Sequence, residues 1–228
     1  LIFSMVHLLE EKDPLTRNHS QRVAAIAADT GHRRKLSPRA QYNLTLGALL
    51  HDIGKLGVPE SILLKPERER TAEDQEFYRL HTSLGERILQ PIESLAGALP
   101  FVRQHHERRD GSGYPRGSVA RHLAPEIELL AAANAYDMAR ATYPRNAAAQ
   151  AEALREEGRA GRFEPALVEE IIRSGERLAA AGTLPTIEDL LPVPEIDPGG
   201  RILVADDNST NRQLYRELLA DDPGAIAH

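Results

Sequence analysis

Helix signals recur along the first 181 residues, whereas no convincing alternating strand pattern appears before residue 200. Ser37-Pro38, Pro125 and Pro165 each place a proline at a first helical position, where proline is well tolerated. The alanines at 131–133 indicate a helix in close contact with its neighbours. We expect an all-α bundle with helices at about residues 2–11, 18–31 with Asn18 as N-cap, 38–52, 71–89, 94–107, 125–137, 147–157 and 165–181, and a loop at 58–70.

The end of the chain has a different pattern. Prolines, glycines and acids crowd residues 182–200, which is typical of a linker. A short apolar run then ends in Asp206 and Asp207, and residues 210–219 have helical spacing. We therefore expect a helical domain at 1–181, a linker at 182–200, and at 201–228 the start of an α/β unit with too little chain to complete a sheet.

Composition excludes several classes of protein. The chain has 228 residues, enough for one domain plus a fragment, and a formal net charge of −6, which argues against binding a nucleic acid polymer. No run approaches the roughly 20 apolar residues of a membrane span, and the first residues lack the pattern of a signal peptide. Cysteine is absent, so histidine and carboxylate are the strong metal ligands available. We expect a cytoplasmic protein, cut from a longer chain because it lacks an initiating Met.

The stretch from His105 to Pro115 carries the strongest local signal. Two adjacent imidazoles are followed by an acid and a Gly-x-Gly-Tyr-Pro turn. At a helix end that faces a pocket both histidines could reach one site, whereas on a solvated helix they would point in different directions. By itself the stretch is equally compatible with a metal or catalytic site and with an ordinary helix end.

Five of the nine histidines lie where helices could converge. A helical bundle can place side chains from facing helices around a pair of metal ions. Imidazole and carboxylate suit iron, manganese or zinc, and two such ions can hold and polarise a phosphodiester. Asp52 could bridge two ions because a carboxylate has two oxygens. The five histidines are His19, His51, His81, His105 and His106.

These motifs resemble the HD-GYP domain, a helical metal-dependent phosphodiesterase that cleaves the bacterial messenger cyclic di-GMP. The resemblance covers about residues 5–180. It rests on the runs at 12–23, 50–59 and 105–115, with Leu64-Lys65-Pro66, His81 and Phe163-Glu164-Pro165 between and after them.

The resemblance implies a site and its partners. Asp52 would bridge two divalent ions, iron or manganese, and Lys55 would lie beside the scissile phosphate, so both would be catalytic. Gly113, Tyr114 and Pro115 would shape the pocket for cyclic di-GMP. Residues 201–219 look like the start of a response-regulator receiver domain, which suggests two-component signalling. The partners expected besides the substrate are GGDEF-type or other signalling proteins and a second copy of the chain in a homodimer. The metal ligands would be His19, His51, Asp52, His81, His105, His106 and, at the seventh position, Asn134.

Several departures from the family pattern leave two functions open. Asn134 stands where the family has an aspartate ligand, and Asp137, three residues on, is a less expected substitute. The family's arginine near the substrate phosphate is displaced or lost at 142–145. Leu15 replaces the glutamate that permits a third ion in some members, so we expect two ions at most. The leading hypothesis is hydrolysis of cyclic di-GMP to pGpG and GMP; the alternative is an impaired module that binds metal or cyclic di-GMP for signalling or scaffolding.

Overall fold

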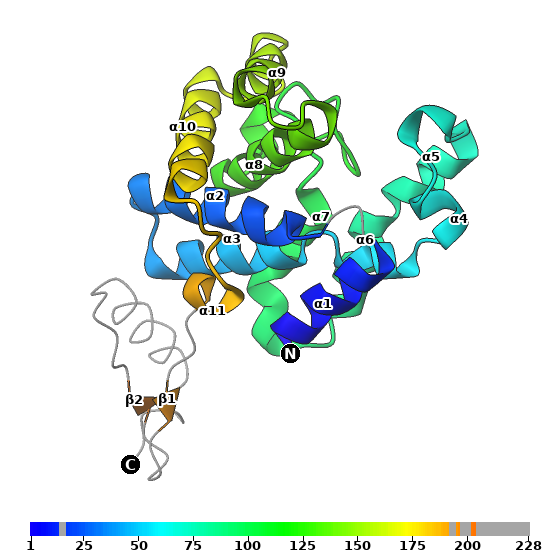
Figure 1. Ribbon diagram of the computed structural model, residues 1–228. Helices are drawn as coiled ribbons and strands as arrows, with labels where there is room; N and C mark the ends of the chain where they lie inside the picture. Colours follow the sequence, from blue (N-terminus) through cyan, green and yellow to red (C-terminus); the bar gives the residue numbers. More distant parts are fainter. Residues whose placement is uncertain (14–16, 192–194, 197–201, 204–228) are drawn as a thin grey trace.

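The computed structural model describes residues 1–13, 17–191, 195–196 and 202–203, and up to residue 191 the described chain is an all-α bundle (Figure 1). No helix in these ranges is long and apolar enough to cross a membrane. The α-helices are α1 (Ile2–Lys12), α2 (His19–Arg33), α3 (Pro38–Leu50), α4 (Glu60–Leu63), α5 (Ala72–Arg79), α6 (His81–Leu89), α7 (Leu99–Gln104), α8 (Pro125–Thr142), α9 (Ala147–Arg159), α10 (Pro165–Ala181) and α11 (Ile187–Leu190). The 3-10 turns are η2 (Ile53–Gly57), η3 (Glu67–Glu69), η4 (Glu93–Ala98) and η5 (Ala120–His122).

Helix α2 lies at the centre of the bundle, packed against α3, α8 and α10. Its inward face carries Val23, Ala24 and Ala27, which are fully buried. The expected close contact of the alanine helix is confirmed, since residues 131–133 of α8 are all buried. Figure 1 shows α8, α9 and α10 on one side of α2 and α3, with α4 and α5 forming a lobe away from the bundle.

The local signals fixed most helix starts. The Ser37 hydroxyl accepts a hydrogen bond from the backbone N–H of Ala40, with Pro38 at the first helical position. Thr71 and Asp74 form a reciprocal capping box at the start of α5. Asn18 is different, because it adopts a left-handed conformation and its side chain caps nothing. Its backbone N–H instead donates to Glu10, which ties the start of α2 to α1.

Three predicted segments were wrong in their boundaries. The expected helix at 71–89 is divided at Leu80, so His81 begins α6 rather than lying inside a helix. The segment at 94–107 is η4 followed by α7, with Pro100 in the first turn, where its missing N–H is not needed. The expected loop at 58–70 contains α4 and η3.

The described part of the predicted linker is partly helical. Thr186 and Asp189 form a capping box for α11, and Ile187 and Leu191 are buried in the core. Beyond α11, β1 (Glu195–Ile196) pairs antiparallel with β2 (Ile202–Leu203). The rest of the predicted receiver fragment, with Asp206, Asp207 and the helix at 210–219, lies outside the described residues, as does Leu15.

Candidate metal centre

The His51-Asp52 pair lies immediately after α3, at the point where the chain turns into η2. Both side chains are buried. Gly54 makes this turn possible, because a Cβ there would overlap the backbone carbonyl of His81 and the backbone N–H of Gly85. The absence of a side chain at Gly54 therefore lets α6 approach η2 and brings His81 beside Asp52.

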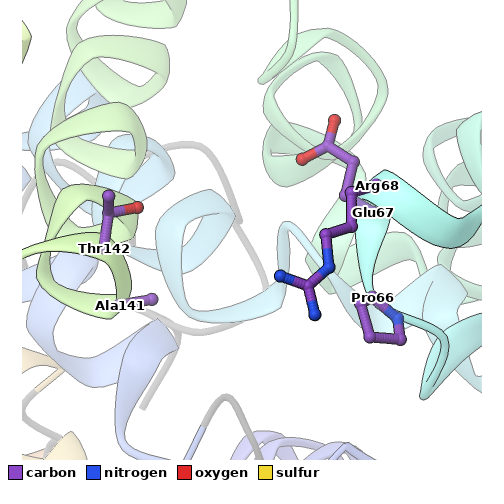
Figure 2. Close-up of a pocket in the computed structure, with 5 residues that line it drawn as sticks. All are labelled: Pro66, Glu67, Arg68, Ala141 and Thr142. Carbon is purple, nitrogen blue, oxygen red and sulfur yellow. The ribbon is translucent and has the colours of Figure 1, made fainter.

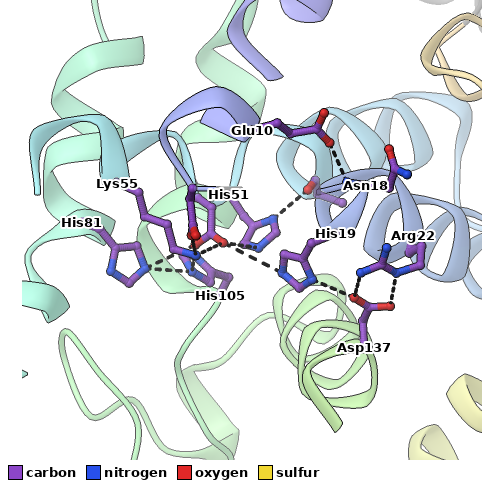
Figure 3. Close-up of polar contacts among 12 residues, drawn as sticks. Glu10, Asn18, His19, Arg22, His51, Lys55, His81, His105 and Asp137 are labelled. Atoms are coloured by element: carbon purple, nitrogen blue, oxygen red, sulfur yellow. Dashed lines mark hydrogen bonds and ion pairs between the residues drawn. The ribbon is translucent and has the colours of Figure 1, made fainter. Parts of the chain in front are cut away.

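Three of the histidines are held in the same way by the helix turns that carry them. In each, Nδ1 lies within hydrogen-bond distance of the carbonyl oxygen three residues earlier. A carbonyl can only accept, so Nδ1 carries the proton and Nε2 keeps its lone pair. Figure 3 shows these rings turned toward a common point. The pairs are His51 with Ala48 at 2.7 Å, His81 with Tyr78 at 2.6 Å, and His105 with Val102 at 2.9 Å.

The two oxygens of Asp52 face two different groups of imidazoles. Oδ1 lies 3.6 Å from Nε2 of His81 and 3.7 Å from Nε2 of His105. Oδ2 lies 3.3 Å from Nε2 of His51 and 3.9 Å from Nε2 of His19. Each group offers ligand atoms that lie within 4.8 Å of one another, and only Asp52 belongs to both. We call them the His81 group (Asp52, His81, His105, His106) and the His19 group (His19, His51, Asp52).

Cations would resolve contacts that are otherwise unfavourable here. Nε2 of His51 and Oδ1 of Asn134 are buried without any hydrogen-bond partner, which is costly for polar atoms. The Nε2 atoms of His81 and His105 lie 3.3 Å apart, and the carbonyl bonds at their Nδ1 atoms direct two lone pairs at each other. The donors are imidazoles and a carboxylate, so they fit a first-row divalent metal better than calcium or magnesium.

Burial keeps the imidazoles in the neutral form that binds metal. It lowers the pKa of His81 to about 4 and holds the pKa values of His105 and His106 well below the ordinary value. Burial would raise the pKa of Asp52, but the positive charge of Lys55 opposes this effect, and that pKa lies well below its usual value. At neutral pH His81, His105 and His106 therefore present uncharged imidazoles beside the Asp52 carboxylate anion.

Lys55 is buried inside the same site. Its Nζ lies 2.8 Å from Oδ2 of Asp52 and 3.1 Å from Oδ2 of Asp13. Burial alone would lower the pKa of Lys55, but the negative charge of Asp52 raises it, so the ammonium stays charged. The sequence reasoning quoted Asp13 only as part of a motif, and nothing in a separation of 42 residues indicated that it would reach Lys55.

His19 differs from His51, His81 and His105 because its Nδ1 partner is a carboxylate. Nδ1 lies 2.8 Å from Oδ2 of Asp137, and Arg22 binds both oxygens of that carboxylate at 2.7 and 2.9 Å (Figure 3). Asn134 lies three residues before Asp137 and is also buried, so the two share one face of α8. Burial lowers the pKa of His19, although the bond to Asp137 opposes this effect.

The loop after the histidine pair folds back on His106. The ring of Tyr114 stacks on the His106 ring, with centroids 4.6 Å apart, and its backbone N–H donates to the His106 carbonyl. A Cβ at Gly113 would overlap the backbone at 106–108. The buried carboxylate of Glu107 accepts hydrogen bonds from the backbone N–H groups of Arg116 and Ser118, both at 2.7 Å. The peptide bond before Pro115 is cis.

A cleft of about 790 Å³ opens between the α4–α5 lobe and the end of α8. Pro66, Glu67 and Arg68 form one wall, and Ala141 and Thr142 form the other. Figure 2 shows the Arg68 guanidinium extending into the gap. Ala141 lies about one helical turn beyond Asp137 on α8. A volume of this size is within the range of small-molecule sites.

The sequence profile of the HD domain family matches residues 4–167, a segment that contains the whole metal centre. The chain belongs to the HD domain family. This HD domain is 32% identical over 188 residues to a "Probable cyclic di-GMP phosphodiesterase" of Vibrio cholerae, an alignment that covers 74% of the chain and 42% of that relative. It is 34% identical over 180 residues to a "Cyclic di-GMP phosphodiesterase" of Thermotoga maritima, covering 75% of the chain and 48% of that relative. The chain thus spans less than half the length of these relatives.

Solved structures agree with the HD-domain fold. An HDG"Y"P protein from Bdellovibrio bacteriovorus superposes with a TM-score of 0.56 at 24% identity, over 68% of this chain and 50% of that one. The HD domain of the Listeria monocytogenes phosphodiesterase PgpH, solved in complex with cyclic-di-AMP, superposes with a TM-score of 0.61 at 17% identity, over 81% of this chain and 99% of that one. The expected all-α, HD-type bundle is confirmed.

This HD domain brings together most of the residues named from the sequence. The five histidines and Asp52 converge, with Lys55 bound to Asp52 and Tyr114 packed on His106. Asn134 is buried with an unpaired oxygen, and whether it binds an ion stays a prediction. Sequence reasoning missed Asp13, Arg22 and Glu107, because their partners lie far away in the sequence or are backbone atoms.

Proposed function

We propose that this HD domain belongs to the HD-GYP subgroup and hydrolyses cyclic di-GMP to pGpG and GMP with two bound divalent ions, iron or manganese. The observation that carries the proposal is the position of Asp52, whose two oxygens each face a separate group of imidazoles. Relatives named as cyclic di-GMP phosphodiesterases, at about a third identity, support the same reaction class.

Each residue of the centre has a definable task in such a reaction. When bound, a pair of divalent ions polarises a phosphodiester and lowers the pKa of water. The neutral imidazoles would hold the ions, with Asp52 as the shared anionic ligand. The ammonium of Lys55, fixed by Asp52 and Asp13, would offset negative charge that develops on the phosphate.

In this proposal the loop at 110–119 and the cleft bind the substrate. Tyr114 presents its ring beside His106 and is held there through Gly113 and Glu107. Arg68 on the opposite lobe is exposed and makes a weak contact with Glu69, at 3.5 Å. An anionic dinucleotide in the cleft would meet this cation.

A second function has a specific observation in its favour. Asn134 offers a neutral oxygen where the family resemblance implies a charged ligand, which weakens the hold on one ion. A domain with one firmly bound ion could still recognise cyclic di-GMP and act as a signalling or scaffolding module. The altered segment at 142–145, which is exposed, favours the same alternative.

The decisive experiment measures hydrolysis and metal content together. The purified chain is loaded with manganese or ferrous iron, its ions per chain are counted, and cyclic di-GMP, 3'3'-cGAMP and cyclic-di-AMP are offered separately, with products separated by chromatography. We expect two ions and turnover of cyclic di-GMP, abolished by Asp52→Asn and unaffected by Glu93→Gln at the exposed start of η4. Binding without turnover would contradict the enzyme and favour the module; preferential cleavage of another dinucleotide would contradict the substrate.

The location of the protein, its protein partners and its C-terminal fragment stay predictions. A cytoplasmic location, GGDEF-type partners, a homodimer and the receiver fragment at 201–228 are expectations from the sequence alone. The family match ends at residue 167, before that fragment begins.

A further inference from the structure

The His19 side of the metal centre differs from the rest in how its imidazole is held. His51, His81 and His105 each donate from Nδ1 to a neutral backbone carbonyl three residues earlier. His19, at the first position of α2, is held by a side chain from another helix. Its Nδ1 donates instead to Oδ2 of Asp137, at 2.8 Å, across the interface between α2 and α8.

Arg22 fixes the orientation of that carboxylate. Its Nε donates to Oδ1 of Asp137 at 2.7 Å and its Nη2 donates to Oδ2 at 2.9 Å, a two-bond fork of the strongest kind. Arg22 lies three residues after His19 on α2, so both partners of Asp137 belong to one face of one helix. The Asp137 side chain is 1% exposed, and both of its oxygens are occupied by these bonds.

We propose that Asp137, locked by Arg22, is the positioning residue for His19 and sets the affinity of the ion in the His19 group, without itself being a ligand. The bond to Asp137 fixes the proton on Nδ1 and directs the free Nε2 toward Asp52. An anionic partner also makes the imidazole a stronger donor to a metal, and loss of such a partner typically weakens metal affinity about 10- to 100-fold. The inference rests on the metal-binding part of the proposed function.

The charges of the two groups explain why an anionic partner is placed here. The His19 group has two imidazoles and a share of Asp52, with the neutral Asn134 on the nearby face of α8. The His81 group has three imidazoles and the other oxygen of Asp52. The carboxylate of Asp137, acting through His19, adds negative charge on the side that has fewer ligands.

A ligand role for Asp137 would require its bonds to break. A rotation that turned an oxygen toward an ion would cost the fork with the half-buried Arg22 and would leave the N–H of the buried His19 imidazole without its partner. Removal of Arg22 therefore has opposite effects under the two roles. It weakens binding of the ion in the His19 group if Asp137 positions His19. It strengthens that binding or leaves it unchanged if Asp137 is a ligand.

The test titrates the metal-free chain with manganese by calorimetry, counts ions per chain, and records the electron spin resonance spectrum that distinguishes coupled from single manganese ions. Asp137→Asn and Arg22→Gln should each leave one manganese ion tightly bound and lower the affinity for the other 10- to 100-fold. The spectroscopic signal of coupled ions should then be lost. Arg22→Lys should restore part of the affinity, because a cation remains beside Asp137. None of these readouts depends on hydrolysis.

Arg140→Gln is the matched control. Arg140 lies 3.8 Å from Oδ1 of Asp137, and it lines the same outer cavity of about 370 Å³ as Arg22, so either shortened side chain leaves space for water. It should leave both ions in place. The inference would be overturned if Asp137→Asn kept the wild-type affinity for both ions or lost affinity for both equally. It would also be overturned if Arg140→Gln weakened binding as much as Arg22→Gln, or if the wild-type chain bound no manganese. Two tight ions without turnover of any cyclic dinucleotide would instead overturn the proposed function alone.

Discussion

The ammonium nitrogen of Lys55 lies 2.8 Å from Oδ2 of Asp52, the carboxylate oxygen that also faces His19 and His51. Lys55 therefore competes with an ion of the His19 group for the same oxygen. Asp13, at 3.1 Å, holds the ammonium from the other side. This arrangement keeps a cation inside the site at neutral pH, where it can meet a phosphate.

Lys55→Met should separate metal binding from catalysis. Removal of the ammonium frees Oδ2 of Asp52, so we expect manganese to bind more tightly. Turnover should fall by about 10² to 10³, because the charge that offsets the phosphate is lost. Lys65→Met is the control, since Lys65 pairs with Asp74 at the surface of the lobe. A parallel loss of metal and activity would mean that Lys55 only supports the fold.

Asn134→Asp should raise the affinity for the second ion. The buried Oδ1 of Asn134 has no partner, and an aspartate there would present a charged oxygen on the same face of α8 as Asp137. We expect a higher ion count at limiting manganese and faster hydrolysis. Asn146→Asp is the matched control, because Asn146 caps α9 and aspartate caps equally well. No change in ion count or rate would mean that Asn134 does not face the ions.

Gly54→Ala should disrupt both stability and metal binding. A methyl group there overlaps the His81 carbonyl, a backbone atom that cannot move unless α6 shifts. We expect a loss of about 3 kcal/mol in the free energy of unfolding, measured with urea, and weaker manganese binding by the His81 group. Gly57→Ala is milder, because its nearest neighbour is a Leu84 methyl at 3.0 Å that can rotate away. Equal effects of the two substitutions would contradict this account.

The metal-free protein should lose stability as pH falls from 7 toward 4. In the folded state burial lowers the pKa of His81 from 6.5 to about 4, and it also lowers the pKa values of His19, His105 and His106. Below about pH 6.5 the unfolded chain therefore binds more protons than the folded chain. Each such proton removes about 1.4 kcal/mol of stability per pH unit, and little is lost above pH 7.

Urea unfolding with a chelator at pH 7, 6 and 5 measures this proton uptake. His81→Gln should reduce the slope of stability against pH by about one proton between pH 6 and 5. His32→Gln should leave the slope unchanged, because His32 is exposed at the end of α2. A stability that stays constant over this range would contradict the buried, neutral imidazoles.

The helix starts predicted from the sequence agree best with the structure where the signal was local. Ser37-Pro38, Thr71 with Asp74, and Pro165 all start helices, since each acts on backbone groups within one turn. Predictions failed where a tertiary contact decided the matter. Asn18 adopts a left-handed conformation without a capping bond, and its N–H donates to Glu10 of α1. Helix α11 has a local capping box, but its place in the fold depends on Ile187 and Leu191, which reach the core.

The sequence by itself determined the kinds of donor in this protein and the short runs that carry them. The His51-Asp52 pair, the His105-His106 pair and the glycines beside them are local facts, and the family resemblance follows from their order. Only the tertiary structure decided how the donors divide, with Asp52 shared between two groups and Asp137 bound directly to both His19 and Arg22. The physical reason is that ion sites and buried ion pairs depend on distances of a few ångströms between helices far apart in the chain, and the packing of α2 against α3 and α8 sets those distances.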